Sequence, residues 1–106
     1  MTSTQELETR RGYYPDGQLR WEGNYKDGEL HGLLRGYYLN GQLQVEKNYE
    51  NGEENGLCRW WYPDGQLEVE WNYKNGLRHG LSRGWYGNGQ LMWEDNWEND
   101  KLIEQS

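Results

Sequence analysis

The sequence predicts an all-β protein, an open single-layer antiparallel sheet of about eight strands built from tandem β-hairpins. Three observations predict it: a 24-residue unit that recurs along the chain, hydrophobic alternation with a period of two, and turn signals at both ends of each unit. A fixed period of this length is typical of modular arrays in which each unit packs on its neighbours.

The repeat is visible in residue types that return every 24 positions. The most regular ones are Tyr14, Tyr38, Tyr62 and Tyr86, Gly17, Gly41, Gly65 and Gly89, Glu22, Glu46, Glu70 and Glu94, and Asn24, Asn48, Asn72 and Asn96. The units span residues 12–35, 36–59, 60–83 and a shortened 84–99. We expect residues 1–11 to form a lead-in or first strand. Residues 100–106 are expected to form a C-terminal tail, because Asp100 stands where the next turn glycine is due.

Each unit is expected to supply two strands. In residues 66–73 every second side chain is apolar, which is typical of a strand covered on one face. The same alternation predicts that Leu19 and Trp21 share a face. It leaves open whether Tyr13 or Tyr14 joins them, because the two kinds of turn can impose different registers.

The turns are explicit in the sequence. Pro15-Asp16-Gly17 predicts a type I turn closed by a left-handed glycine, and pairs such as Asn75-Gly76 close the other end of each unit. The strand that follows, residues 31–38 in the first unit, is rich in glycine. We expect cross-strand Trp and Tyr rings to cover these glycines, since glycine otherwise weakens a strand.

Composition narrows the class of protein. The chain has 106 residues, enough for one domain, a net charge of -7, seven Trp, nine Tyr and no Phe. Such a content suits a thin structure with half-exposed aromatic faces. A single cysteine, Cys58, cannot form an intramolecular disulfide, and no apolar run is long enough for a leader or a membrane span. We therefore expect a cytoplasmic protein. Its acidity disfavours nucleic acid and anionic lipid and favours a basic partner.

No set of residues predicts catalysis. The four repeated glutamates share one environment, whereas acid–base catalysis needs carboxylates in different environments. We interpret them as cross-strand hydrogen-bonding groups. His31 and His79 have no other ligand type beside them, so no metal site is expected. Cys58 is expected to be a small buried residue. The sequence thus predicts no enzyme, no cofactor and no metal.

Aromatic residues are the strongest candidates for a functional site. They concentrate in the C-terminal half, where acidic residues also gather. The candidate partner-binding set is Tyr37, Trp61, Trp71, Trp85, Trp93 and Trp97, together with Glu94, Asp95 and Glu98. The rings can equally serve as a thin core over the glycines. A single layer has two faces and cannot bury both without a partner, and Trp and Tyr commonly anchor interfaces.

The stretch YYPDGQLRWEGNYKDGELHG resembles the MORN-repeat variant family, and the resemblance covers residues 12–99. It implies an elongated single-layer sheet of tandem hairpins. Many bacterial proteins made of such repeats are identified as antitoxins of the YwqK type, and others are described only as interaction modules. The usual Glu-Gly of the motif is replaced by Glu46-Lys47, Glu70-Trp71 and Glu94-Asp95, so one stripe of the sheet is particular to this protein.

These observations favour a non-catalytic protein-binding module from a bacterium or a phage. It would neutralise a protein partner with a basic surface, as an antitoxin, an immunity protein or a nuclease inhibitor does. The alternatives are a carbohydrate- or cell-wall-binding module and a general scaffold or membrane-associated MORN protein. Dimerisation through the sheet edges is also open, because an open sheet leaves two edge strands.

Overall fold

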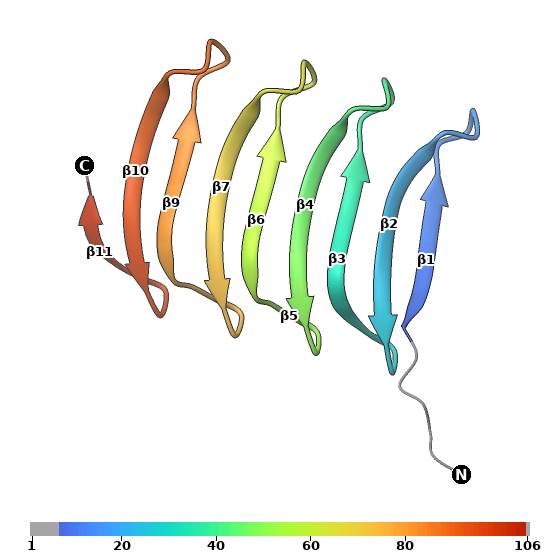
Figure 1. The fold of residues 1–106 in the computed structure, drawn as a ribbon, viewed down its shortest axis with the longest axis horizontal. Helices are drawn as coiled ribbons and strands as arrows, with labels where there is room; N and C mark the ends of the chain where they lie inside the picture. Colours follow the sequence, from blue (N-terminus) through green and yellow to red (C-terminus); the bar gives the residue numbers. More distant parts are fainter. Residues whose placement is uncertain (1–6, 106) are drawn as a thin grey trace.

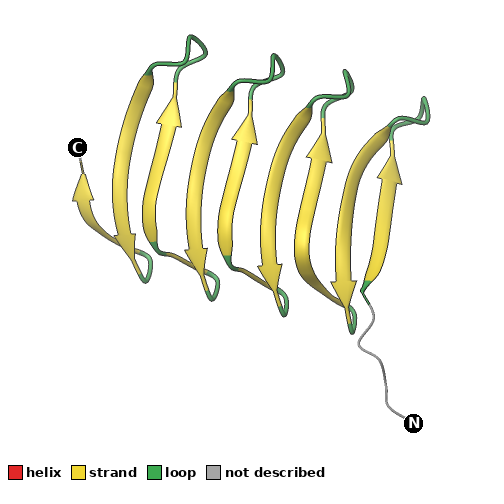
Figure 2. Cartoon of the chain, in the orientation of Figure 1, coloured by secondary structure: helices red, strands yellow, loops and turns green. Residues whose placement is uncertain are grey.

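The protein is one open antiparallel sheet, described here for residues 7–105 from a computed structural model. Its strands run side by side from one end of the molecule to the other (Figure 1), and Figure 2 shows strands and loops only. The predicted fold class is confirmed. No helix long and apolar enough to cross a membrane occurs in the described part of the chain.

The sheet contains eleven strand segments rather than about eight. They are β1 (Glu8–Tyr13), β2 (Leu19–Lys26), β3 (Glu29–Tyr37), β4 (Leu43–Glu50), β5 (Glu53–Glu54), β6 (Gly56–Trp61), β7 (Leu67–Lys74), β8 (Leu77–Arg78), β9 (Gly80–Trp85), β10 (Leu91–Glu98) and β11 (Lys101–Gln105). Two of the eleven segments are short pieces of longer strands. A single residue separates β5 from β6, and another separates β8 from β9. The lead-in supplies β1, and the segment assigned to a tail supplies β11, which pairs with β10.

Both predicted kinds of turn are present. Gly17 at the Pro-Asp-Gly turn has φ 92°, and its amide donates to the Tyr14 carbonyl at 2.8 Å. The Asp16 carboxylate accepts from the Gln18 amide at 3.0 Å, which fixes the turn further. At the opposite end Asn75 has φ 51° and is followed by a glycine that is also left-handed, as a two-residue type I′ turn requires.

A β-bulge near the start of each long strand corrects the predicted alternation. Gly12 lies opposite Trp21, but Tyr13 lies opposite Leu19, so Arg20 is an extra residue in β2. Because directly paired residues share a face, Leu19 lies with Tyr13 on the face opposite Trp21. The prediction that Leu19 and Trp21 share a face was therefore wrong, and Tyr13 is the tyrosine that joins Leu19.

Side chains tie successive repeats together. The Tyr14 hydroxyl donates to the Tyr37 carbonyl at 2.6 Å, and the same bond recurs at Tyr38 and Tyr62. Each of these bonds links a turn to the strand of the next unit. The sheet measures 53 × 37 × 14 Å. A single layer exposes side chains on both of its faces, so the rows of side chains that cross the sheet decide what each face can contact.

Candidate functional site

The pairing register sorts the side chains into rows that cross the sheet, four of which matter for function. Residues directly opposite one another share a face, and neighbours along a strand point to opposite faces. One face carries a row of alternating arginine and glutamate, and we call this surface the ion-pair face. The row consists of Arg11, Glu22, Arg35, Glu46, Arg59, Glu70, Arg83 and Glu94.

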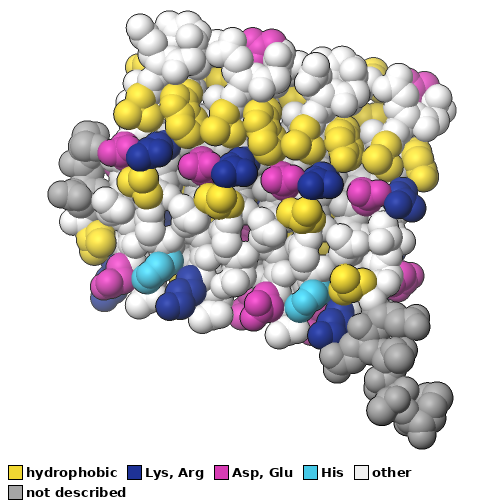
Figure 3. Space-filling model, in the orientation of Figure 1, with side chains coloured by type: hydrophobic (Ala, Val, Ile, Leu, Met, Phe, Trp, Pro, Cys, Tyr) yellow, Lys and Arg dark blue, Asp and Glu magenta, His cyan; other side chains and the backbone are white. Residues whose placement is uncertain are grey.

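The ion-pair row is hydrogen-bonded within every hairpin. Arg35 Nε donates to Glu46 Oε2 at 2.8 Å, and this bond raises the pKa of the Arg35 guanidinium. The equivalent bonds in the other three hairpins measure 2.6–2.7 Å. Figure 3 shows the row as alternating blue and magenta side chains across the molecule. The prediction that the repeated glutamates make cross-strand hydrogen bonds is confirmed.

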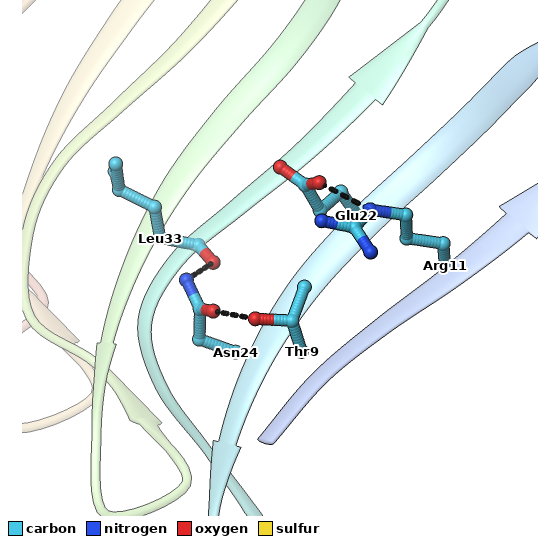
Figure 4. A network of polar contacts seen from close by, with 5 residues as sticks. All are labelled: Thr9, Arg11, Glu22, Asn24 and Leu33. Atoms are coloured by element: carbon cyan, nitrogen blue, oxygen red, sulfur yellow. Dashed lines mark hydrogen bonds and ion pairs between the residues drawn. The ribbon is translucent and has the colours of Figure 1, made fainter. Parts of the chain in front are cut away.

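An asparagine row runs beside the ion pairs on the same face. Asn24 Nδ2 donates to the Leu33 carbonyl at 3.3 Å, and Thr9 Oγ1 donates to the Asn24 side-chain carbonyl at 2.9 Å (Figure 4). Asn48 and Asn72 repeat the bond to the strand backbone. These asparagines hold the irregular strand beside them, where a left-handed glycine interrupts the ladder.

An apolar band lies on the other side of the ion pairs, again on the ion-pair face. In this band aromatic rings alternate with leucines, one per strand. Its members are Tyr13, Leu19, Tyr37, Leu43, Trp61, Leu67, Trp85 and Leu91. Tyr13 is 58% and Leu91 51% exposed at the two ends of the band.

The opposite face carries most of the tryptophan. In one row large and small residues alternate, and a Cβ on Gly84 would lie 2.3 Å from Trp93 Nε1. The Trp21 ring covers Gly12 in the same way. Covering of strand glycines by tryptophan is therefore confirmed at these positions, whereas Val45 covers Gly36.

The central row of this face repeats nothing. Its eight members are eight different amino acids, in contrast to the two that build the ion-pair row. They are Arg10, Gly23, Leu34, Lys47, Cys58, Trp71, Ser82 and Asp95. We call this the variable row and the surface around it the variable face. The stripe of departures from the Glu-Gly motif, predicted from sequence, lies in this row.

Trp71 is the centre of an aromatic cluster on the variable face. Its ring centroid lies 5.4 Å from that of Trp93 and 6.2 Å from that of Trp97. The Arg78 guanidinium lies 4.7 Å from both the Trp71 and the Trp97 ring, which is cation–π distance. Trp97 Nε1 donates to Ser82 Oγ at 3.1 Å. Three rings and one cation thus form a fixed ridge.

Small buried residues flank Trp71 in the variable row. Cys58 is 3% and Ser82 1% exposed, and no other non-glycine residue with a described side chain is as buried. Burial raises the pKa of the Cys58 thiol to about 11, so the thiol is protonated at neutral pH. The predicted role of Cys58 as a small buried residue is confirmed. Its size leaves room for the Trp71 ring.

The structure divides the predicted partner-binding residues between the two faces. It places Trp71, Trp93, Trp97 and Asp95 together on the variable face. The remaining five lie on the ion-pair face, where Tyr37, Trp61 and Trp85 belong to the apolar band. Glu94 there is bonded to Arg83 at 2.6 Å, and Glu98 ends β10 beside Lys101.

Arg78 is a contact residue that the sequence reasoning missed. Its position in the repeat is occupied by Leu30 in the first unit and Glu54 in the second, so it varies as strongly as the variable row. This variation at one position of an otherwise regular repeat is the signal in the sequence that could have pointed to Arg78. In residues 7–105 no three His, Cys, Asp or Glu side chains come close enough together to hold a metal ion.

Tandem hairpins, tyrosine ties between units and a repeated row of Arg–Glu pairs define a β-hairpin repeat module. The comparison with known families agrees: the MORN repeat variant matches residues 9–27, 30–51, 54–75 and 78–99. The chain belongs to this family. No curated protein and no solved structure matches it.

Proposed function

We propose that this chain is a non-catalytic binding module that docks a partner protein on its variable face and thereby neutralises it. The observation that supports this most is the variable row, in which an array built by repetition uses a different residue on each of eight strands. A repeated residue serves the scaffold that every unit needs. A residue that differs in each unit can match an irregular partner surface where it is accessible. Gly23, Cys58 and Ser82 are buried, so the accessible members of the row would make the contact; they are Arg10, Leu34, Lys47, Trp71 and Asp95.

The tryptophan ridge supplies the anchor in this proposal. Trp71, Trp93 and Trp97 are held in place by one another and by Arg78, so little side-chain entropy is lost when a partner covers them. Tryptophan and arginine are also the residue types enriched among binding hot spots. We place the centre of the interface at Trp71.

Charge favours a basic partner. At the edge of the sheet that carries the type I′ turns, the exposed lysines Lys74 and Lys101 are outnumbered by exposed acidic residues, which form an acidic rim beside the ridge. They are Asp27, Glu29, Glu50, Glu53, Glu98 and Asp100. Together with the net charge of -7 this rim would speed the encounter with a basic surface. A toxin or nuclease with a basic substrate cleft fits this description, and the activity would then be that of an antitoxin, an immunity protein or an inhibitor.

We place this activity in the cytoplasm, where a free thiol such as Cys58 stays reduced. The proposal assigns no catalysis to the chain, because its polar side chains serve the ladders and turns of the scaffold. The partner alone is expected to carry enzymatic activity.

The test compares two tryptophans on opposite faces. The wild type, Trp71→Ala and Trp61→Ala are used in parallel to capture partners from the native host, and the captured protein is then titrated in purified form. Trp71→Ala is expected to weaken binding by roughly 2 kcal/mol, and Trp61→Ala to change it little. Equal losses in both variants, or binding to a glycan array without any protein partner, would contradict the proposal.

A second pair of variants tests the charge argument. Asp95 and Glu94 are sequence neighbours on opposite faces, so Asp95→Lys and Glu94→Lys make the same charge change on different surfaces. Asp95→Lys is expected to slow association more than Glu94→Lys when the rates are measured by stopped flow at low salt. Association that speeds up with added salt would exclude a basic partner surface.

A further inference from the structure

The ion-pair face is complementary to itself. We propose that two copies of this chain stack through their ion-pair faces, related by a twofold axis that runs parallel to the strands between β4 (Leu43–Glu50) and β6 (Gly56–Trp61). The inference is independent of the proposed function, which uses the variable face. It predicts a dimer whose two variable faces both point outward.

Charge complementarity carries the inference. The ion-pair row contains eight charges of alternating sign, beginning with arginine and ending with glutamate. Turning the row end for end about the proposed axis therefore sets every charge opposite one of the other sign. The pairs between copies are Arg11 with Glu94, Glu22 with Arg83, Arg35 with Glu70 and Glu46 with Arg59, each formed twice.

The apolar band matches itself under the same rotation. Its aromatic residues occupy the odd places in the row and its leucines the even places, so each ring meets a leucine of the other copy. Tyr13 would cover Leu91, and Leu43 would cover Trp61. The two most exposed members of the band, Tyr13 and Leu91, are thereby buried against each other.

The face is large enough for this contact. The sheet is 53 × 37 Å across and 14 Å thick. Covering half of that surface would bury about 1,000 Å² on each copy, and a standard interface needs about 800 Å² per partner. An isologous contact of this kind closes on itself and forms a dimer rather than a filament.

The side chains of the row are accessible to a second copy. The arginines keep 36–49% and the glutamates 19–31% of their side-chain surface exposed. Burying them costs desolvation energy, which opposite charges on the other copy offset. We therefore assign the affinity to the apolar band and the register of the two copies to the charges. A surface that repeats in every unit suits a second repetitive surface better than an irregular partner.

Pair swaps within one hairpin test the proposal. Arg11→Glu with Glu22→Arg keeps an ion pair inside the first hairpin but sets like charges against the second copy. It also sets an arginine at position 22 beside Arg35 of the same chain, a contact that the chain with both swaps retains and therefore controls for. Arg83→Glu with Glu94→Arg does the same in the fourth hairpin. Each swap variant alone is expected to dimerise at least about 100-fold more weakly than the wild type, since facing like charges cost several kcal/mol. Sedimentation equilibrium over a concentration series measures this, with a monomer mass of 12.7 kDa as reference.

Two recombinations separate the interface from a folding defect. The chain that carries both swaps restores opposite charges at all eight contacts and is expected to dimerise like the wild type. An equimolar mixture of the two single-swap variants restores them as well and is expected to form a heterodimer. Trp71→Ala, on the other face, should leave the dimer unchanged.

Several results would overturn the proposal. One is a wild-type chain that stays monomeric throughout the concentration series. Another is a dimer that the single swaps leave intact, which would point to pairing through the sheet edges. A third is a dimer that Trp71→Ala abolishes, which would place the contact on the variable face. Failure of both recombinations to restore a dimer would also contradict it.

Discussion

The two faces of the sheet are built from the same strands by opposite strategies. On the ion-pair face each hairpin repeats the same solution, such as the Arg35–Glu46 bond at 2.8 Å and the Asn48 bond to the Leu57 carbonyl at 3.1 Å. On the variable face the residue between two such positions, Lys47, has a different counterpart in every unit. The comparison teaches that the ion-pair row is kept in every unit, whereas the central row of the variable face has diverged beside positions that still repeat, such as Tyr25, Tyr49 and Tyr73.

Steric compensation allows that divergence without loss of packing. Where the repeat places glycine, as at Gly84, the neighbouring strand supplies a tryptophan, Trp93. At the equivalent position of the preceding unit the chain has Trp60 instead of glycine, and the residues opposite Trp60 are the smaller Val45 and Val69. One large side chain per small neighbour keeps the layer filled in either arrangement. In this row the sequence can therefore change while the space between neighbouring strands stays filled.

The largest expected effect tests this compensation. Gly84→Trp would place a second ring where Trp93 already lies, and overpacking of this kind is expected to lower the free energy of unfolding by about 3 kcal/mol. Adding Trp93→Val recreates the Val-Trp-Val arrangement found around Trp60 and should recover most of the loss. Urea denaturation at one fixed protein concentration measures both variants. No recovery in the double variant would mean that the two arrangements are not interchangeable.

The turn glycines are expected to rank next. Gly41 and Gly65 have φ values of 89° and 96°, and a β-branched residue is strained there. Gly41→Val or Gly65→Val should cost about 1–3 kcal/mol of stability in thermal or urea denaturation. Gly87 lies in the equivalent turn of the fourth unit with open space around it and without a left-handed φ. Gly87→Val is the control and should cost clearly less; an equal loss would argue against backbone strain.

A smaller effect concerns pH. Burial raises the pKa of the Cys58 thiol to about 11 from an ordinary value of 9.0. The unfolded chain thus loses this proton first as the pH rises, so stability is complete below pH 9 and falls between pH 9 and 11. At pH 10 the loss should be on the order of 1 kcal/mol. Cys58→Ser, which copies the residue at the same position of the third unit, Ser82, should lack this component. Identical pH profiles would contradict the burial argument.

Much of the fold was predictable because the same local signal occurs four times. The turn at Gly17, the cross-strand role of Glu22 and the burial of Cys58 all follow from residue types at fixed positions. The bulge at Arg20 was not predictable, because a single extra residue changes the face of Leu19 without changing the hydrophobic pattern.

The candidate site was predictable only in part, for a related reason. Composition indicated that tryptophan and acid gather near the C-terminus, but it could not assign faces. Trp85 and Trp93 belong to opposite faces because they lie on paired strands in adjacent rows. Arg78 was missed because its contact with Trp97 depends on how the β7–β8 hairpin folds back beside β10 (Leu91–Glu98).

The smallest expected effect compares charges on the two faces directly. Glu46 and Lys47 are neighbours on β4 (Leu43–Glu50). Glu46 accepts a 2.8 Å bond within the ladder, whereas Lys47 lies outside the ladder, 3.7 Å from Glu54 and 5.5 Å from the centre of the Trp60 ring. Glu46→Gln should cost about 0.5–1 kcal/mol, because it interrupts a hydrogen-bonded network, and Lys47→Gln less than about 0.5 kcal/mol. Urea denaturation at low and high salt measures both at one fixed protein concentration. Since the ladder bonds are partly shielded from solvent, the cost at Glu46 should persist in high salt, and a larger cost at Lys47 would reverse the assignment of scaffold and variable faces.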